Sequence, residues 1–227
     1  MAFPNTLFQI VKEINDTIVQ VSTPSYKQDP LFTDRRFLKI SHEAICQEPR
    51  LIQGPNELLT GELLKKLEQL KGTPYVWGGN YHKGIPELLE FYPPSRELTA
   101  HERTNWTLAG VDCSGLLYQV TEGLTPRNTS ELVHFGRAVE IQDLTLEKIM
   151  QIVSPLDLIV WLGHVVIVYD GDRTIESRVG KGVVFTNLKE RLQEIIETEK
   201  KRPVNHWDPS IKDKSRFVIR RWHGIFA

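Results

Sequence analysis

The sequence has few cysteines, no dominant charge and no long apolar run. Its 227 residues include two cysteines, Cys46 and Cys113, which are too few for a disulfide framework and form no CxxC pair of the zinc-binding kind. Lys and Arg total 28 against 29 Asp and Glu, and the net charge of -1 gives no general attraction for nucleic acid or anionic lipid. The most apolar stretch, residues 156–169, is interrupted and falls short of the roughly 20 residues of a membrane helix. We therefore expect neither a nucleic-acid nor a membrane partner.

Other absences narrow the class of protein further. The N-terminus lacks the basic start and unbroken apolar run of a signal peptide, because Lys12 and Glu13 interrupt it. We therefore expect a cytoplasmic protein, with export by another route as the alternative. The seven histidines show no HExxH spacing and no clustered ligand set, so we expect no metal and no other cofactor. The composition, 40% hydrophobic and 25% charged, is that of a globular protein of one or two domains.

The first 55 residues differ from the rest of the chain in their pattern of apolar residues and prolines. Apolar residues recur there at helical spacing and predict a helix: Leu7, Ile10, Val11, Ile14 and Ile18. A turn-rich passage with several prolines follows. We therefore separate an N-terminal accessory region, residues 1–55, from a main domain over residues 56–227.

The main domain begins with predicted helices. Leucines at helical spacing predict a helix over residues 56–70 that ends at Gly72. A second helix within residues 111–123 has Cys113 in its first turn. Irregular chain is expected between these two helices and over a loop at residues 124–131, and a short helix follows over residues 145–153.

The rest of the main domain is predicted to form antiparallel strands. Runs rich in β-branched and aromatic residues, separated by turn residues, occupy residues 158–162, 164–169, 174–177, 183–185 and 216–222. A helix that Asn187 opens, with Glu190 three residues on, precedes the last run. Helices first and strands afterwards predict an α+β fold.

Cys113 is the first candidate for chemistry. A thiol in the first turn of a helix lies at the positive end of the helix dipole, which favours the nucleophilic thiolate. A lone cysteine is nevertheless more often a small buried hydrophobe, and Asp112 is more often a helix cap than a catalytic group. Cys46 has no predicted element around it, and we interpret it as a structural residue without a catalytic role.

A nucleophilic thiol needs a base, and the second predicted strand begins with one, His164. If the loop at residues 170–172 has three residues, Glu176 lies opposite Val166 and diagonally beside His164 on the same face. With a two-residue loop, Glu176 would lie on the opposite face. A triad of these two residues with Cys113 therefore requires the three-residue loop. Taken singly, each is more often a structural group of its strand.

Three blocks of the sequence together resemble the NlpC-type (NlpC and p-sixty) papain-like cysteine peptidases, which cut peptides of bacterial peptidoglycan. The blocks are GTPYVWGG at 72–79, DCSGLLY at 112–118 and GHVVIVYDGDRTIESR at 163–178, and the resemblance covers about residues 59–185. It implies a papain-like core in which the catalytic cysteine, at a helix N-terminus, packs on an antiparallel sheet. Papain's own signature around its cysteine is absent.

The resemblance implies a role for each matching residue. It makes Cys113 the nucleophile, His164 the general base and Glu176 the third polar residue, where the family more often has His, Asn or Gln. A glutamate would still fix the imidazole tautomer and favour imidazolium. The hydroxyl of Tyr75, with the backbone N–H of Cys113, is expected to stabilise the oxyanion.

The resemblance also implies substrate-binding residues. Asp112 and Ser114 match positions that help to hold the terminal amine of free muropeptides, and Trp77 would form a pocket wall, although a tryptophan there is as readily a core residue. The segment 126–132 resembles the family's Pro-Arg-x-Ser loop and offers three weaker candidates, Asn128, Thr129 and Ser130.

Three departures from the family pattern stand out. The connection over residues 80–111 is much longer than usual, and we expect this insertion to border the cleft and restrict which peptides enter it. Leu156 stands where the family has a glycine before a strand. Related enzymes carry a small targeting barrel of the bacterial Src-homology type, which makes residues 1–55 a candidate for such a barrel although the sequence shows no barrel pattern.

Three classes of function remain open at this point. The leading one is a cysteine endopeptidase that hydrolyses the γ-D-glutamyl–diamino acid amide bond of peptidoglycan-derived peptides, in muropeptide turnover or recycling. Its partner would be a peptidoglycan stem peptide or muropeptide. The alternatives are a papain-like acyl transferase, because an amine or alcohol can also capture a thioester, and a non-catalytic wall-peptide binding module.

Overall fold

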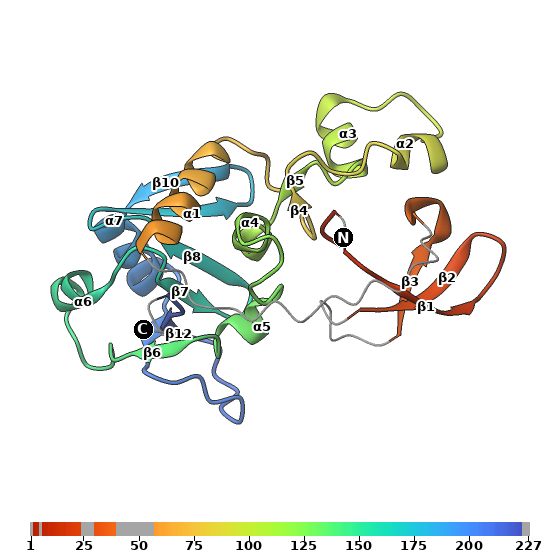
Figure 1. The fold of residues 1–227 in the computed structure, drawn as a ribbon. Coiled ribbons are helices and arrows are strands. Elements are labelled where there is room, and N and C mark those ends of the chain that lie inside the picture. Colours follow the sequence, from red (N-terminus) through yellow and green to blue (C-terminus); the bar gives the residue numbers. More distant parts are fainter. Residues whose placement is uncertain (1, 5, 24–29, 40–56, 224–227) are drawn as a thin grey trace. The chain divides into compact units, whose positions relative to one another are not determined.

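The computed structural model describes residues 2–4, 6–23, 30–39 and 57–223 (Figure 1). The chain divides into two compact units, Ala2–Ile52 and Gln53–Ala227. Cys46 lies outside the described residues.

The described part of the smaller unit is a three-stranded antiparallel sheet in the order β1-β2-β3. Its elements are β1 (Gln9–Glu13), β2 (Ile18–Ser22), β3 (Leu31–Asp34) and the 3-10 turn η1 (Arg35–Phe37). The helix predicted from the apolar spacing of residues 7–18 is therefore wrong. The Asn15 side chain accepts from the N–H groups of Thr17 and Ile18, at 2.9 and 2.7 Å, and so stabilises a turn between two strands. The barrel in this region stays a prediction.

The α-helices of the described residues lie in the larger unit. They are α1 (Glu57–Gln69), α2 (Leu88–Phe91), α3 (Ala100–Trp106), α4 (Cys113–Val120), α5 (Thr129–Leu132), α6 (Leu146–Ile152) and α7 (Leu188–Gln193), which a π-helical turn, η2 (Glu194–Thr198), continues. The predicted helices at α1, α4, α6 and α7 are confirmed. None of the described helices is long and apolar enough to span a membrane.

The strands of the larger unit form one main sheet in the order β10-β9-β8-β7-β12-β11, with β6 also paired to β12. They are β6 (Arg137–Val139), β7 (Leu158–Trp161), β8 (His164–Val168), β9 (Arg173–Arg178), β10 (Gly182–Asn187), β11 (Arg202–Pro203) and β12 (Arg216–Arg221). The five predicted strands are all present, and β7 to β10 form an antiparallel meander. The predicted α+β class is confirmed.

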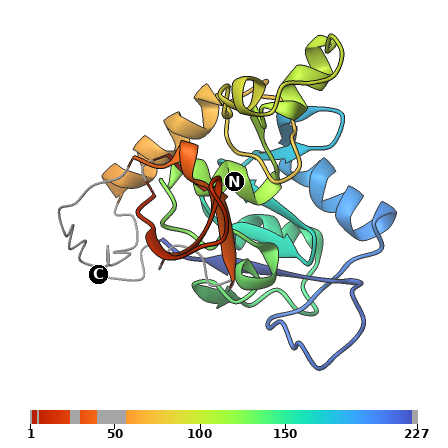
Figure 2. The same ribbon diagram turned by 90° about the vertical axis from the view of Figure 1, so that its right-hand side faces the viewer.

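The core of the larger unit lies where helices meet this sheet. β7 is buried along its whole length, and β8 is buried after its first residue. Helix α4 packs against β8 and β9, and α1 lies alongside α4 (Figure 2). The inward leucines of α4, Leu116 and Leu117, are fully buried. The first turn of α4 is thereby held against the strands that carry His164 and Glu176.

The segment over residues 80–111, predicted to be irregular, contains short elements instead. The strands β4 (Asn80–Tyr81) and β5 (Gly110–Val111) pair at its two ends, and α2 and α3 lie between them. Thr99 and Glu102 form a capping box at the start of α3. This Ser/Thr-x-x-Glu pattern is a sequence signal for a helix start, and the prediction overlooked it.

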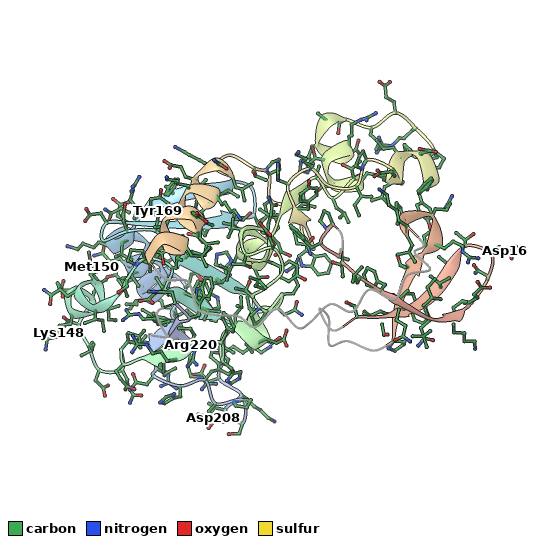
Figure 3. The ribbon with its side chains drawn as sticks, viewed as in Figure 1. Asp16, Lys148, Met150, Tyr169, Asp208 and Arg220 are labelled. Carbon is green, nitrogen blue, oxygen red and sulfur yellow. The ribbon has the colours of Figure 1, made fainter. Side chains whose placement is uncertain are left out.

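Two further local features anchor the sheet. Leu156, where the resemblance places a glycine, takes a left-handed backbone conformation with φ 69°, and its side chain is fully buried. Arg220 of β12, labelled in Figure 3, is buried and donates to the backbone carbonyls of His134, Phe135 and Gly136. The turn before β6 is thereby fixed to β12.

Candidate active site

Helix α4 begins at Cys113 because Asp112 caps it. The Asp112 carboxylate accepts from the N–H of Gly115 at 2.7 Å, which satisfies one of the donors that a helix start leaves unpaired. A Cβ atom on Gly115 would lie 2.0 Å from the carbonyl oxygen of Gly79, so only glycine fits there. The Asp-Cys-Ser-Gly sequence thus fixes both the start of the helix and its close packing.

The turn between β7 and β8 places His164 beside this helix start. Trp161 pairs with His164, which leaves Leu162 and Gly163 as a two-residue turn with Gly163 at φ 102°. The Cys113 Sγ atom lies 3.8 Å from the carbonyl oxygen of Gly163, and Cys113 as a residue is 7% exposed. The sulfur is therefore shielded but adjacent to the turn that carries the candidate base.

The pairing of β8 with β9 has the register that the triad requires. Ile167 pairs with Ile175 and Val168 with Thr174, so residues 170–172 form the three-residue loop. This prediction is confirmed. The Nε2 atom of His164 lies 2.6 Å from Oε2 of Glu176.

The charges of these side chains follow from their contacts. Burial disfavours the imidazolium of His164, but hydrogen bonding and charge from Cys113 and Glu176 outweigh it and raise the pKa of His164 from 6.5 to about 9. Burial would also raise the pKa of Glu176, but hydrogen bonds from His164 and Arg191 lower it overall, so Glu176 is a carboxylate at neutral pH. Because a carboxylate only accepts, His164 donates to Glu176 from Nε2.

Arg191 is the residue of this cluster that the sequence analysis missed. Its Nε donates to Oε1 of Glu176 at 2.6 Å and its Nη2 to Oε2 at 3.1 Å. Arg191 is 1% exposed and Glu176 is fully buried. The available signal was a glutamate in a position that the family more often fills with a neutral or weakly basic side chain, because a buried carboxylate requires a counter-charge.

Tyr75 lies close to the start of α4. Its backbone forms an isolated bridge with Val111, two residues before Cys113. Partial burial, with the nearby charges of Cys113 and Asp112, raises the pKa of Tyr75. The phenol therefore stays protonated and is able to donate a hydrogen bond near the sulfur.

Asp112 and Ser114, the predicted amine-binding residues, belong to a buried network. Arg127 donates from Nη2 to Oδ2 of Asp112 at 2.7 Å and from Nη1 to Oγ of Ser114 at 2.9 Å. The Asp112 carboxylate also accepts from the N–H of Gly78 at 3.0 Å. An amine at this place would meet a carboxylate that Arg127 already neutralises, and the amine-binding role stays a prediction.

The other predicted substrate residues are more accessible. Trp77 is 83% exposed, so it is not a core residue. Asn128 and Ser130 are exposed as well, whereas Thr129 accepts through Oγ1 from the N–H of Gly163 at 2.9 Å. Thr129 therefore holds the turn beside Cys113, and Trp77, Asn128 and Ser130 remain candidates for contact with a ligand.

A hollow of about 310 Å³ adjoins the candidate base. Its lining residues are Trp161, His164, Arg178, Val179, Arg191 and Glu199. Within the described part of the chain, no three His, Cys, Asp or Glu side chains gather in a way that would hold a metal ion. The chemistry that these residues offer is a sulfur nucleophile with an imidazole that takes and gives a proton.

No family model matches the sequence, and no curated protein matches it. Among solved structures, the chain is similar to an NlpC/P60 family protein from Bacillus cereus, with a TM-score of 0.43 and 16% identity over 95% of this chain and 53% of that one. It thus spans about half the length of that protein.

Two shorter NlpC/P60 proteins are similar as well. RipD from Mycobacterium tuberculosis, a non-catalytic domain protein adapted to peptidoglycan binding, has a TM-score of 0.39 and 21% identity over 56% of this chain and 86% of its own. The NlpC/p60 domain of the peptidoglycan hydrolase SagA has a TM-score of 0.33 and 19% identity over 58% of this chain and 91% of its own. All three of these solved structures belong to the family that the three sequence blocks resemble.

Proposed function

We propose that the chain is a cysteine endopeptidase that hydrolyses the amide bond between γ-D-glutamate and a diamino acid in peptidoglycan-derived peptides. One observation supports the catalytic part above all others. Cys113, His164 and Glu176 come from three different elements, α4, β8 and β9. His164 contacts Glu176 at 2.6 Å, and Cys113 and Glu176 both raise the pKa of His164. A thiol, an imidazole and a carboxylate in this order are the parts of a papain-like nucleophilic site.

In the proposed first step, the Cys113 thiolate attacks the carbonyl carbon of the γ-glutamyl amide. The Tyr75 hydroxyl and the backbone N–H of Cys113 would stabilise the oxyanion. His164 gives its proton to the amide nitrogen, the C–N bond breaks, and the diamino acid leaves as an amine. The product is a γ-glutamyl thioester on Cys113.

In the second step, water attacks the thioester carbonyl. His164, now neutral, takes a proton from the water, the C–S bond breaks, and the free carboxylic acid leaves. Glu176 accepts from Nε2 of His164 throughout and so holds the imidazole in one orientation. The thiolate and the imidazolium are restored together.

The bond and the substrate come from the family resemblance rather than from the geometry. Among the similar proteins, RipD is adapted to peptidoglycan binding and SagA is a peptidoglycan hydrolase, which agrees with a ligand of this class. We propose that the activity serves the turnover or recycling of muropeptides, in the cytoplasm.

The test uses the tripeptide L-Ala-γ-D-Glu-diaminopimelate and mass detection of the products. The chain is expected to release diaminopimelate, and Cys113→Ala to release none, whereas Cys46→Ala serves as the matched thiol control and keeps the activity. Addition of hydroxylamine would reveal acyl transfer as a γ-glutamyl hydroxamate. Equal product from the chain and Cys113→Ala would contradict the proposal, as would tripeptide that binds but stays intact; the latter result would support the binding module.

A further inference from the structure

Glu176 and Arg191 form a charge pair directly behind the candidate base. We propose that Arg191 is a positioning residue of this site, which keeps Glu176 ionised and in place as the acceptor for His164, so that the pair acts as one charge-balanced unit. The catalytic meaning of this inference rests on the proposed function. The contact between Glu176 and Arg191 is observed independently of that function.

The contacts give the pair a fixed geometry. Two nitrogens of the Arg191 guanidinium meet the two oxygens of Glu176, at 2.6 and 3.1 Å. The oxygen that accepts from Arg191 Nη2, Oε2, is also the one that accepts from His164. Such a planar fork holds a carboxylate in one orientation, which a single ammonium does not.

Arg191 is itself held from its other side. Its Nη1 lies 2.7 Å from Oε1 of Glu199 and 3.1 Å from Oε2 of Glu194. Its guanidinium carbon lies 5.9 Å from the centre of the Trp161 ring, and the same ring lies 5.2 Å from that of His164. The guanidinium is therefore bounded by acceptors and an aromatic face and has little freedom to turn away from Glu176.

Burial explains why Glu176 depends on this partner. A carboxyl group that is fully shielded from water tends to keep its proton unless an opposite charge is close. Burial raises the pKa of Glu176, and the contacts with His164 and Arg191 more than offset it. A protonated Glu176 would no longer hold a charge opposite the imidazolium, and the thiolate form of the Cys113–His164 pair would become less populated.

The charged groups around Glu176 come from several elements. His164 of β8 and Arg191 of α7 contact it directly. Cys113 of α4 lies beyond His164, and Glu194 and Glu199 lie beyond Arg191. Arg178 of β9 pairs with Glu194. Of these groups, Arg191 is the one whose removal leaves Glu176 with His164 as its single direct partner among the described residues.

The test measures how fast iodoacetamide alkylates Cys113 as a function of pH, in the full chain with Cys46→Ala. In Arg191→Met, Glu176 takes up a proton as the pH falls from neutrality. We expect the acidic limb of the rate profile to move up by about one pH unit, which makes alkylation about tenfold slower near pH 6 and changes it by less than about twofold near pH 8.

A second variant removes the titrating group. Glu176→Gln alone leaves the buried Arg191 with Glu199 and Glu194 but without its fully buried carboxylate partner, so we expect a lower melting temperature and slow alkylation. Glu176→Gln with Arg191→Met replaces the ion pair by neutral side chains, and we expect alkylation to recover by about tenfold over Glu176→Gln alone, a coupling typical of contacting residues. Arg191→Lys keeps the positive charge but not the planar two-nitrogen contact. Its alkylation profile is expected to lie between those of Arg191→Met and the parent.

Arg221→Met is the matched structural control. Arg221 makes a two-nitrogen contact with the fully buried Asp157 at the opposite end of β7, at 2.8 and 2.6 Å. This variant should lose thermal stability without any shift of the alkylation profile. The inference is overturned if Arg191→Met lowers the rate equally at all pH values, or if the effects of the two single variants multiply in the double variant. Intact tripeptide alongside a shifted alkylation profile would remove the proposed function and leave this inference standing.

Discussion

Replacing Cys113 with alanine should lower the pKa of His164, because Cys113 supplies the first of the contacts that raise it. The pKa of His164 stands at about 9, against 6.5 for an unperturbed imidazole. At 1.36 kcal/mol per pKa unit this difference corresponds to about 3 kcal/mol of net support for the imidazolium. Burial opposes that support and remains in the variant, so we expect a fall of about one unit or more.

The measurement is an NMR titration of the histidine ring nitrogens in the chain and in Cys113→Ala, with Cys46→Ala as the control that should titrate like the parent. The same shift predicts a change in stability with pH. A histidine whose pKa is raised by folding contributes its full stabilisation below the unfolded value of about 6.5, and this contribution is lost as the pH rises through about 9. Cys113→Ala should therefore lose less stability than the parent between these two pH values.

Two results would refute this reasoning. In the first, His164 of the parent titrates near or below 6.5, which would mean that burial cancels or outweighs the support from both partners. In the second, His164 has the same pKa in Cys113→Ala as in the parent, which would mean that Glu176 alone supports the imidazolium.

The remaining predictions concern three separate features. Arg127→Met should lower the free energy of unfolding in urea by about 3 kcal/mol or more, because the carboxylate of Asp112 stays buried without its partner; a smaller change would mean that water replaces the guanidinium. Deletion of Gly171 should shorten the β8–β9 loop and turn Glu176 to the other face, so that Cys113-directed alkylation slows while the fold, followed by circular dichroism, persists. Deletion of residues 82–105 should broaden the range of peptides cleaved, and an unchanged range would show that the insertion does not restrict entry.

The sheet and the triad geometry were predictable because a few local rules determine them. Alternation along a strand and the length of one loop fix which side chains share a face, and this placed Glu176 beside His164. The start of α4 was predictable from the capping residue Asp112. Both predictions depend on residues close to one another in sequence or paired across one turn.

Features that depend on how elements pack were not predictable in the same way. The amphipathic pattern of α7 identifies Leu188 and Leu192 as inward residues, but it does not show that Arg191 between them meets β9. At the N-terminus, the apolar spacing suited a helix, and the turn made by Asn15 separated it into two strands. In each case, contacts with a neighbouring strand override the local pattern.

The backbone of Gly163 connects helix α5 with the candidate nucleophile. Its N–H is bound by Thr129, its carbonyl faces the sulfur at 3.8 Å, and the next residue along the chain is His164 itself. The place of this turn beside the sulfur therefore depends on two backbone contacts, one with α5 and one with α4, as well as on the hairpin itself. Segments that make neither contact can differ in sequence and length while the turn keeps its place, whereas a change around Thr129 would alter the neighbouring ligand candidates and the turn together.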